Sequence, residues 1–310
     1  MITLDKIKIV SHISNIELLD ENRFKKVIRE GRIIERKYYE EKYLLDITIN
    51  YEKDELVLEF TGKILEEGYP QLISLRTIGK CFENINSLGL CLIDVEGMMD
   101  SDVVKCDITK DIAVENVPAL TKFIRNHNKN YLTILCRKMK NGNMTIEKNV
   151  TGKKYKKRMV VYDKGKEMRN ADNKQFVQDN GLEGYFDGLC RFELNLNSKE
   201  QIRKSLGITN TKLKTVLGAE TNPILDFIDE VVKAEIPTTI MTDKKAYITN
   251  LVLQDCDYDL ERVQAKMREF YPSKGTNMKK VMEPYRLMME KVEQTDGQEY
   301  WNAIREKLAE

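Results

Sequence analysis

The 310-residue sequence lacks several features that would assign it to a common class of protein. No apolar run approaches the roughly 18 residues that a membrane-spanning helix needs, and Asp5, Lys6 and Lys8 lie where a signal peptide would be apolar. No C-x-x-C pair indicates a zinc or redox site, and no G-x-x-x-x-G-K-[ST] loop or Rossmann fingerprint indicates a nucleotide site. We therefore expect a cytoplasmic protein with no membrane segment, whose six cysteines are buried thiols.

Charge is balanced over the whole chain but not along it. The net charge is +1, yet the nine basic and two acidic side chains from Lys148 to Arg169 give that segment a charge of +7. The rest of the chain therefore carries −6. A positive field concentrated in one short segment is typical of an anion site, and the phosphate backbone of nucleic acid is its commonest partner. A solvated basic loop is the alternative.

Periodicity divides the chain into an α+β region, residues 1–210, and a helical C-terminal region, residues 211–310. Alternating or β-branched runs predict strands at 6–10, 42–50, 56–65, 103–108, 131–136, 144–148, 158–162 and 189–196. Helical spacing predicts helices at 16–30 and 117–128. In the C-terminal region two sets of apolar residues have the spacing of a helix face: Leu260, Val263, Met267 and Phe270, and Trp301, Ile304 and Leu308.

Three segments place charged or phenolic groups on or beside an apolar strand, where burial is unfavourable unless the groups are used. They are residues 105–111, 158–167 and 189–196. Alternate residues of a strand share a face, which groups Asp107, Thr109 and Asp111, and likewise Arg191, Glu193 and Asn195. Carboxylates from neighbouring strands suit Mg²⁺ or Mn²⁺, which prefer oxygen ligands. A cross-strand salt bridge between Arg191 and an acid is the alternative.

Tyr162 ends one of these strands and is followed by Lys164 and Lys166. A free tyrosine has a pKa near 10 and is a poor nucleophile, but nearby ammonium groups favour the phenolate. A tyrosine beside basic residues and a carboxylate-bound cation is what a DNA-nicking enzyme needs, because a phosphotyrosine bond stores the phosphodiester energy for rejoining. A tyrosine at the edge of the core is the alternative.

Taken in order, the three segments resemble the motifs of the rolling-circle replication initiators of filamentous phages, the gene II and gene X replication protein family, and of related plasmid and conjugative-element initiators. Residues 105–109 match a pattern of basic or polar residue, apolar residue, Asp, apolar residue and Thr. Residues 160–167 resemble the nucleophile strand with its Tyr-x-Lys, and residues 189–193 match the apolar-x-Arg-Phe-Glu strand. The resemblance covers about a third of the chain, roughly residues 100–200.

The resemblance implies that Tyr162 is the nucleophile that becomes joined to the 5′ phosphate of nicked DNA. Lys164 would steady the scissile phosphate or the phenolate. Arg191 would contact a phosphate or orient a carboxylate. The basic segment would bind the DNA backbone through Lys153, Lys154, Lys156, Lys157, Arg158 and Lys166.

The resemblance also implies a site for Mg²⁺ or Mn²⁺, with Asp107 and Glu193 as the first candidate ligands and Asp111 and Glu167 as further contributors. Larger relatives hold the metal with a His-hydrophobe-His pair. This chain has only two histidines, which are far apart and cannot form that pair. The departure favours a site dominated by oxygen ligands, or one with a single histidine.

The fold implied is an α+β nickase fold without the histidine pair, in which an antiparallel sheet carries Asp107, Tyr162 and Glu193 on its open face. The function implied is metal-dependent, site-specific nicking and strand transfer that starts rolling-circle replication of a phage or plasmid. The partners would be single-stranded or supercoiled origin DNA and the host helicase, polymerase and single-strand-binding protein. Two alternatives stay open: a conjugative nickase, or relaxase, with the same chemistry, and a DNA-binding regulator without catalysis.

Overall fold

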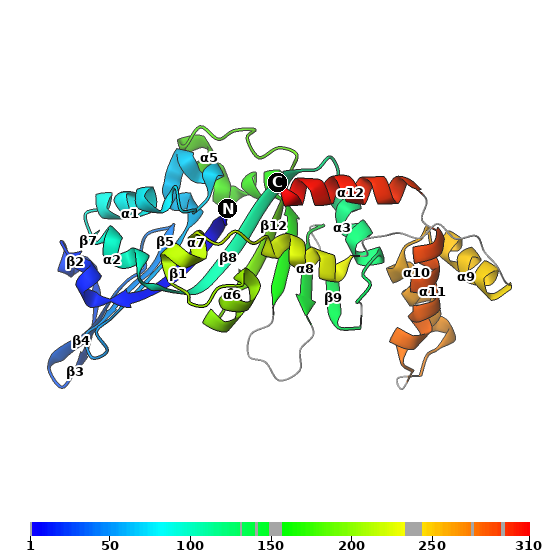
Figure 1. The fold of residues 1–310 in the computed structure, drawn as a ribbon, viewed down its shortest axis with the longest axis horizontal. Helices are drawn as coiled ribbons and strands as arrows, with labels where there is room; N and C mark the ends of the chain where they lie inside the picture. The colour runs from blue at the N-terminus through cyan, green and yellow to red at the C-terminus, as the bar shows by residue number, and fades with distance from the viewer. Residues whose placement is uncertain are drawn as a thin grey trace. The chain divides into compact units, whose positions relative to one another are not determined.

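A computed structural model describes residues 2–130, 132–139, 142–148, 157–232, 244–273, 276–292 and 295–310 of the chain. The chain forms two compact units (Figure 1). The first comprises Met1–Val114 and Thr151–Ile224, and the second comprises Glu115–Val150 and Leu225–Glu310. The division thus differs from the one at residue 210 that periodicity suggests, because residues 115–150 pack with the C-terminal helices.

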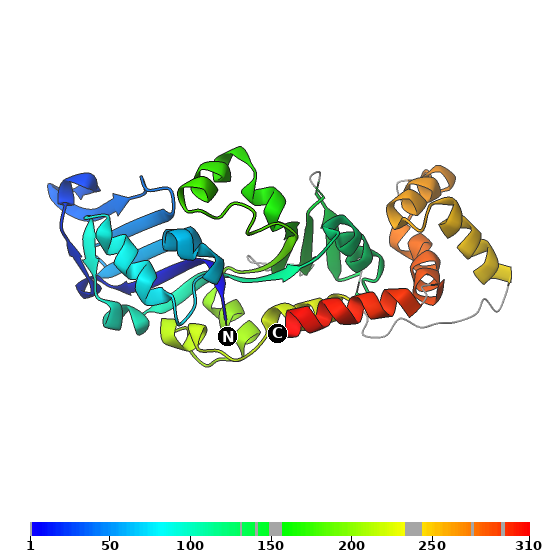
Figure 2. The same ribbon diagram turned by 90° about the horizontal axis from the view of Figure 1, so that it is seen from above.

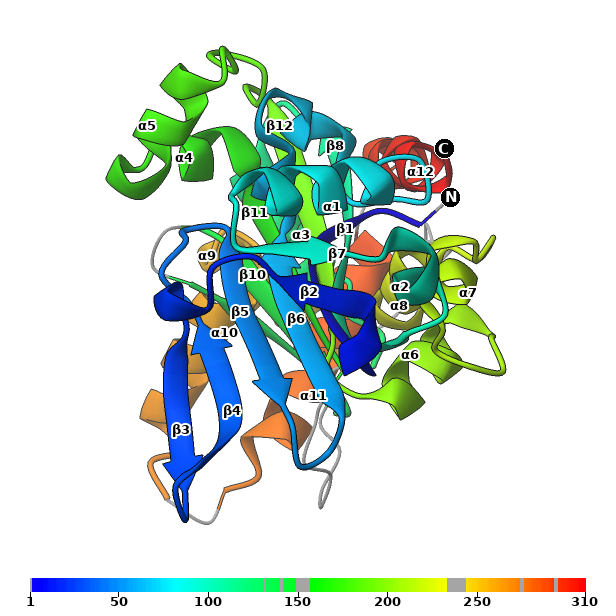
Figure 3. The same ribbon diagram turned by 90° about the vertical axis from the view of Figure 1, so that its left-hand side faces the viewer.

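A large antiparallel sheet forms the centre of the first unit, with the strand order β3-β4-β5-β6-β1-β8-β12-β11. Figure 3 shows β3, β4, β5 and β6 side by side. The strands are β1 (Leu4–His12), β3 (Lys25–Arg29), β4 (Arg32–Tyr38), β5 (Leu44–Asn50), β6 (Glu55–Thr61), β8 (Asp102–Ala113), β11 (Arg158–Asp163) and β12 (Leu189–Leu196). A separate small pair joins β2 (Ile16–Leu18) to β7 (Cys91–Ile93). The expectation of an α+β protein built on an antiparallel sheet is confirmed.

Helices cover both faces of this sheet. The α-helices of the first unit are α1 (Ile78–Ser87), α2 (Val95–Met99), α4 (Lys164–Met168), α5 (Ala171–Asp179), α6 (Lys199–Leu206) and α7 (Leu213–Leu217). Three 3-10 segments accompany them: η1 (Ile13–Asn15), η2 (Glu21–Arg23) and η3 (Gly62–Gln71). Figures 2 and 3 show α6 and α7 on one side of the sheet and α4 and α5 on the other. The face that carries Phe192, Leu194 and Leu196 is fully buried.

The helix expected over residues 16–30 does not form. That stretch contains β2, η2 and β3, and β3 pairs with β4 in antiparallel register. Val27 and Ile28 of β3 are exposed and not gathered on a buried helical face. The hydrogen bonds to β4 in this hairpin satisfy the segment's backbone groups, and the pairing overrides its helical spacing.

The second unit combines a hairpin with six helices within the described residues. The hairpin pairs β9 (Ile134–Lys138) with β10 (Met144–Lys148) in antiparallel register. The helices are α3 (Val117–Asn126), α8 (Pro223–Val231), α9 (Lys244–Asp255), α10 (Leu260–Phe270), α11 (Met278–Val292) and α12 (Thr295–Ala309). Trp301 of α12 is buried and stacks on Phe123 of α3, with 5.7 Å between ring centroids. Arg305 of α12 also bonds both carboxylate oxygens of Asp229 in α8, at 2.8 and 2.6 Å.

Helices α9, α10 and α11 share a hydrophobic core. Val263 and Met267 pack there with Leu253 and Met289, as the predicted helix face requires. Phe270 has the spacing of the same face but is 68% exposed, because it is the last residue of α10 and extends past that core. All six cysteines are free thiols; five are buried as expected, and Cys136 is half-buried. No helix within the described ranges is long and apolar enough to cross a membrane.

Candidate active site

The polar residues of β8, β12 and β11 lie on one face of the sheet, which we call the polar face. The register of β8 and β12 pairs Asp107 with Asn195, Thr109 with Glu193, and Asp111 with Arg191. On the other side of β12, Tyr162 of β11 is also opposite Arg191. The alternation of residues in the sequence predicts which side chains share a face within each strand, but not how the faces of different strands are aligned. The register adds that the three faces coincide, since directly paired residues project to the same side.

A chain of hydrogen bonds joins four of these side chains across three neighbouring strands. The Tyr162 hydroxyl donates to Oε2 of Glu193 at 3.1 Å. Nδ2 of Asn195 donates to Oε1 of Glu193 at 3.2 Å and to Oδ1 of Asp107 at 2.9 Å. Tyr162, Glu193 and Asn195 are half-buried, so each keeps some surface exposed to solvent. The structure therefore brings together the predicted nucleophile and the two first candidate metal ligands.

The pKa values of the ionisable side chains in this hydrogen-bonded series are set mainly by burial. Burial, together with the charges of Asp5 and Asp107, raises the pKa of Glu193 to about 7. Burial also raises the pKa of Asp107, although the hydrogen bond from Asn195 opposes it. The pKa of Tyr162 is raised well above its ordinary value by burial and by the nearby Glu193 charge. Near neutral pH, Tyr162 thus keeps its proton while Glu193 is able to accept one.

Asp5 enters the polar face through a β-bulge in β1. Leu4 pairs with Ile108 and Lys6 pairs with Asp107, so Asp5 is an extra residue with no partner in β8. A bulge lets two consecutive side chains project to the same face. Asp5 consequently lies beside Arg191, which donates to its Oδ1 from Nη1 at 2.7 Å.

Arg191, on the same polar face, is fully buried. Its Nε and Nη2 each donate to one carboxylate oxygen of Asp111 at 2.7 Å, while Nη1 bonds Asp5 and the Tyr69 hydroxyl. These contacts are the cross-strand salt bridge between Arg191 and an acid that the sequence offered as the alternative to a metal site. With no exposed surface and with all three nitrogens engaged, Arg191 does not reach a DNA phosphate in this conformation.

Tyr69 connects Arg191 to Lys164. The Tyr69 hydroxyl donates to Asp5 and accepts hydrogen bonds from Arg191 and Lys164, all at 2.8 Å. Lys164 as a whole residue is 1% exposed, and its ammonium group also donates to Glu167 at 2.6 Å. Burial would raise the pKa of Asp5, but the charges of Arg191 and Lys164 outweigh it and hold that pKa low. This network holds buried charges of both signs in hydrogen-bonded pairs, as burial requires.

Lys164 lies near the predicted nucleophile without bonding to it. Its Nζ is 5.8 Å from the centroid of the Tyr162 ring. Glu167, a possible metal ligand by resemblance, is instead bonded by Lys164 and by Nδ2 of Asn173 at 2.6 Å. Asp111, the other further candidate, is bonded through both oxygens to Arg191. These contacts separate Glu167 and Asp111 from the pair formed by Asp107 and Glu193.

Of the six predicted DNA-binding side chains in the basic segment, three belong to the described residues. Lys157 is half-buried next to β11, and Arg158 and Lys166 are exposed. The other three lie outside the described residues: Lys153, Lys154 and Lys156. The structure adds a group of cations that a search for one basic segment misses, because they come from two strands: Lys6, Lys8 and Lys105, which surround Glu59 at 2.8, 3.0 and 3.8 Å.

Asp5 and Tyr69 are also absent from the sequence-based prediction, for different reasons. The adjacent polar pair Asp5-Lys6, between the apolar Leu4 and Ile7, interrupts the alternation of β1 by one residue and is a usable signal of a bulge. Tyr69 gives no such signal. It lies in η3, far from the motif strands in sequence, and reaches the site only through the tertiary fold.

The residues on the polar face can be compared with what a divalent cation needs. Within the described part of the chain, no three His, Cys, Asp or Glu side chains are grouped closely enough to hold a metal ion by themselves. Mg²⁺ commonly takes only one or two protein carboxylates and completes its shell with water and substrate phosphate. Asp107 and Glu193, linked by Asn195 and both with raised pKa values, fit that pattern because a cation would stabilise their charged forms.

No protein-family model matches the chain, and no curated protein or solved structure matches it either. The function therefore has to be inferred from the chemistry of the polar face.

Proposed function

We propose that the protein is a metal-dependent DNA strand transferase that nicks one strand at a replication origin through a covalent phosphotyrosine and so starts rolling-circle replication. The observation that carries the proposal is the hydrogen bond from Tyr162 to Glu193, a carboxyl group with a pKa of about 7. A buried phenol is a weak nucleophile, and a neighbouring base of near-neutral pKa is the group that can activate it.

In the proposed reaction, Glu193 takes the proton of the Tyr162 hydroxyl as the phenolic oxygen attacks the phosphorus of the scissile phosphodiester. The bond from phosphorus to the 3′ oxygen breaks, and that oxygen takes up a proton from water to give a free 3′ hydroxyl. The 5′ phosphate stays on Tyr162 until a 3′ hydroxyl attacks it and rejoins the strand. The positive charge of Lys164, 5.8 Å from the Tyr162 ring, favours the developing phenolate.

Asp107 would hold Mg²⁺ or Mn²⁺, with the Asn195 amide orienting its carboxylate and that of Glu193, which stays free to act as the base. When bound, the ion supplies Lewis-acid polarisation of a non-bridging phosphate oxygen. Arg191 and Asp111 are positioning residues in this proposal, since their contacts fix β8 against β12 beneath the reacting groups. Glu167 would position Lys164 in the same way.

The substrate would be single-stranded or supercoiled origin DNA. Lys6, Lys8 and Lys105 continue the polar face beyond Asp107, since Lys6 is directly opposite Asp107 in the sheet. They offer a track for the phosphate backbone beside the predicted basic segment. A host helicase, polymerase and single-strand-binding protein would extend the free 3′ end.

The test is to incubate the purified protein with supercoiled DNA and single-stranded oligonucleotides from its own replicon, in the presence of Mg²⁺ or Mn²⁺. Wild type is compared with Tyr162→Phe and with Tyr185→Phe, a control that removes the hydroxyl of an exposed tyrosine in the same unit. We expect a nicked circle and a protein-DNA adduct that mass spectrometry maps to Tyr162. Both should be lost in Tyr162→Phe and retained in Tyr185→Phe.

Two other results would redirect the assignment. If wild type binds this DNA but never cuts it with either metal, the protein is a DNA-binding regulator and not a nickase. If Tyr162→Phe cuts normally, the nucleophile is another residue. A relaxase would give the same adduct, and would be distinguished by cutting at a transfer origin in place of a replication origin.

A further inference from the structure

The β3–β4 hairpin concentrates positive charge at one edge of the sheet. Residues 23–37 contain seven basic and two acidic side chains, which give this segment a net charge of +5. β3 is an edge strand, and all five of its residues are exposed. None of the hairpin's residues takes part in the proposed reaction, so the charge calls for an explanation of its own.

The pairing within the hairpin places like charges directly opposite each other. Three of its five cross-strand pairs join two cations: Lys25 with Lys37, Lys26 with Arg36, and Arg29 with Arg32. Like charges that face each other across an antiparallel pair destabilise it. An anionic partner that contacts the hairpin would offset this repulsion.

The protein neutralises only half of these cations. Three of them have a carboxylate partner: Arg36 with Glu21, Lys37 with Glu35 at 2.8 Å, and Arg29 with Glu52 at 3.2 Å. The other three, Lys25, Lys26 and Arg32, are exposed and form no ion pair with any residue in the described part of the chain. Each of the three cross-strand pairs therefore keeps one free positive charge.

The far end of the hairpin is a two-stranded ribbon. β4 pairs with β5 only over Glu35–Tyr38, and the Tyr51 amide adds one hydrogen bond to the Ile34 carbonyl at 2.9 Å. The turn consists of Glu30 and Gly31, whose φ angles of 51° and 77° are those of a tight two-residue turn that preserves the strand twist. Figure 3 shows this turn reaching past the turn between β5 and β6.

The dimensions of the ribbon match the major groove of DNA. At about 3.3 Å per residue, the backbone from Ile34 to the turn spans about 10 Å. The major groove of B-DNA is about 8.5 Å deep and admits a two-stranded β-ribbon. The free end of the hairpin is therefore long enough to reach the base edges.

The side chains of the ribbon suit a duplex better than a single strand. Residues 25–33 include no aromatic side chain, whereas proteins hold single-stranded DNA largely by stacking its bases on aromatic rings. Arg29 and Arg32 flank the turn, and arginine is the side chain that most often recognises guanine in the major groove. Val27 and Ile28 are 37% and 61% exposed and offer apolar contacts for thymine methyl groups.

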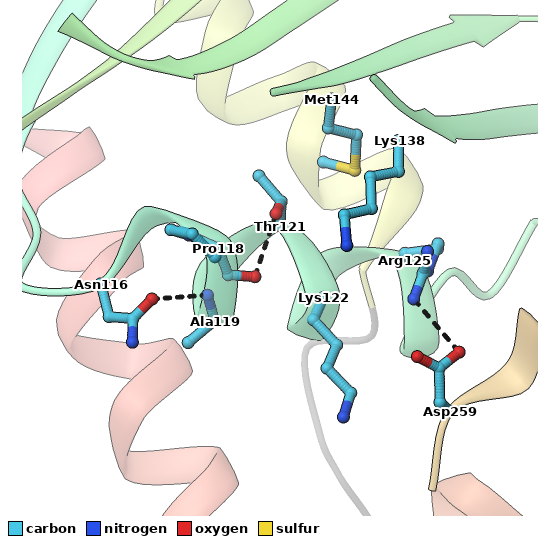
Figure 4. A pocket seen from close by; sticks show the side chains of 9 residues that line it. All are labelled: Asn116, Pro118, Ala119, Thr121, Lys122, Arg125, Lys138, Met144 and Asp259. Atoms are coloured by element: carbon cyan, nitrogen blue, oxygen red, sulfur yellow. Dashed lines mark hydrogen bonds and ion pairs between the residues drawn. The ribbon is translucent and has the colours of Figure 1, made fainter. Parts of the chain in front are cut away.

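A pocket in the second unit shows that basic side chains alone do not make such a site. Its volume is about 280 Å³, and Lys122, Arg125 and Lys138 line it. Figure 4 shows Lys122 and Lys138 extending to opposite sides of α3, and Arg125 paired with Asp259. The cations of that pocket point apart, whereas the register of the hairpin brings its cations together in pairs.

We propose that the β3–β4 hairpin binds duplex DNA, with its ribbon end in the major groove. Consecutive residues of a strand project to opposite sides, so Lys25 and Lys26 reach the phosphates of the two strands that border the groove. Arg32, at the turn, reaches a base edge. The inference rests on the proposed function only for the choice of DNA as the anion, because it involves neither Tyr162 nor the metal ligand.

The first measurement is the affinity of the full chain for three labelled probes: a DNA duplex, oligothymidylate and decaglutamate. All variants are made in the Tyr162→Phe background and studied without metal, so that cleavage plays no part. Lys25→Gln with Lys26→Gln should weaken duplex binding at least about tenfold at 0.1 M salt and lower its salt dependence by about two phosphate contacts. The thermal midpoint without DNA should not fall, because both changes remove a repulsion.

The control for this double variant is Lys80→Gln with Lys204→Gln. These exposed lysines lie on α1 and α6, and each has only an exposed carboxylate partner in its own helix. The same loss of charge there should change duplex affinity by less than about twofold. Equal losses in the two double variants, a loss confined to oligothymidylate or decaglutamate, or a lowered thermal midpoint in the hairpin variant would overturn the proposal.

The second measurement tests the position of the ribbon in the groove. Methylation of guanine N7 blocks an acceptor that only the major groove presents. We expect the methylated duplex to bind less tightly than the unmodified duplex to the parent protein, and both to bind equally to Arg32→Gln. Arg203→Gln, which removes an exposed arginine of α6, should keep the parent's discrimination. If Arg32→Gln keeps it too, the ribbon does not lie in the major groove.

This inference and the proposed strand transfer can fail separately. If wild type forms the adduct on Tyr162 while the hairpin variant binds duplex DNA normally, only the role of the hairpin is wrong. If duplex binding depends on the hairpin but no strand is ever cut, the hairpin's role holds and the strand transfer is wrong.

Discussion

Arg191 and Asp111 face each other across the β8–β12 pair through two parallel hydrogen bonds, each 2.7 Å long. Such a two-pronged contact fixes both the distance and the plane of the guanidinium group. The remaining nitrogen of Arg191 bonds Asp5 of β1 at 2.7 Å, so one buried side chain holds three neighbouring strands together. The Tyr162–Glu193 hydrogen bond lies on the same polar face of these strands.

Replacing Arg191 with methionine should destabilise the first unit strongly. Asp5 and Asp111 would lose their buried counter-ion, and breaking such a pair typically lowers the free energy of unfolding by about 3–5 kcal/mol. Urea unfolding followed by circular dichroism measures the loss. Tryptophan fluorescence does not serve here, because the single tryptophan, Trp301, belongs to the second unit.

The matched control for Arg191→Met is Arg169→Met. Arg169 pairs with Asp187, but both side chains are more than 60% exposed. A solvent-exposed pair contributes at most about 1 kcal/mol. If the two variants lose similar amounts of unfolding free energy, the buried Arg191–Asp111 pair has no structural role.

Glu193→Gln should make the protein more stable above pH 7 and change it little below about pH 4. Glu193 binds its proton more tightly in the folded state, where its pKa is about 7 against an ordinary value of 4.5. The folded state therefore loses stability as pH rises through that interval, and glutamine removes the loss while keeping an oxygen acceptor for Tyr162. Thermal midpoints measured across this pH range test the sign.

Glu220→Gln is the control for this pH effect, because Glu220 is an exposed carboxylate of the same unit. Its stability profile should follow that of wild type. If Glu193→Gln also follows wild type at every pH, the Glu193 carboxyl is not held protonated by burial, and its assignment as the base is wrong.

The central strands of the first unit can be predicted well from the sequence, because their alternation is imposed by one apolar and one polar face. β12 begins and ends where the pattern places it, at Leu189 and Leu196. The same alternation groups Asp107 with Asp111 and Glu193 with Arg191, since strand spacing fixes which residues share a face.

Other parts of the site depend on contacts that no local pattern contains. Lys164 lies in a basic run typical of a solvated loop, yet it is buried because Tyr69 and Glu167 bond its ammonium group. Asp5 reaches Arg191 only because of the bulge in β1. The division into units likewise depends on tertiary packing, which joins residues 115–150 to the C-terminal helices.

Mg²⁺ or Mn²⁺ should stabilise the first unit at pH 8 through Asp107. A ligand bound only by the folded state adds about 1.4 kcal/mol to the free energy of unfolding when its concentration is ten times its Kd. We expect the thermal midpoint to rise with either ion in wild type and not in Asp107→Asn. Asp172→Asn removes an exposed carboxylate of α5 and should leave the response intact. An unchanged response in Asp107→Asn would place the ion elsewhere.

Gly165→Ala should displace α4 and slow strand transfer with little effect on DNA affinity. A Cβ atom at Gly165 would lie 2.8 Å from the carbonyl oxygen of Phe186 and 3.2 Å from the Cα of Asp187. Both are backbone atoms, so the helix has to move, at a typical loss of about 1–3 kcal/mol. Lys164 and Glu167 belong to the same helical turn and would move with it.

Gly79→Ala separates this displacement from a general effect of replacing glycine. A Cβ atom at Gly79, in α1, would meet no atom within 4 Å, so the change should be neutral or stabilise the helix by roughly 0.5–1 kcal/mol. Single-turnover rates at saturating DNA, together with oligonucleotide affinity, measure both variants. A slower rate in Gly165→Ala alone, with unchanged affinity, means that the position of the Lys164 charge governs activation of Tyr162. A normal rate in a displaced α4 would show that Lys164 has no part in it.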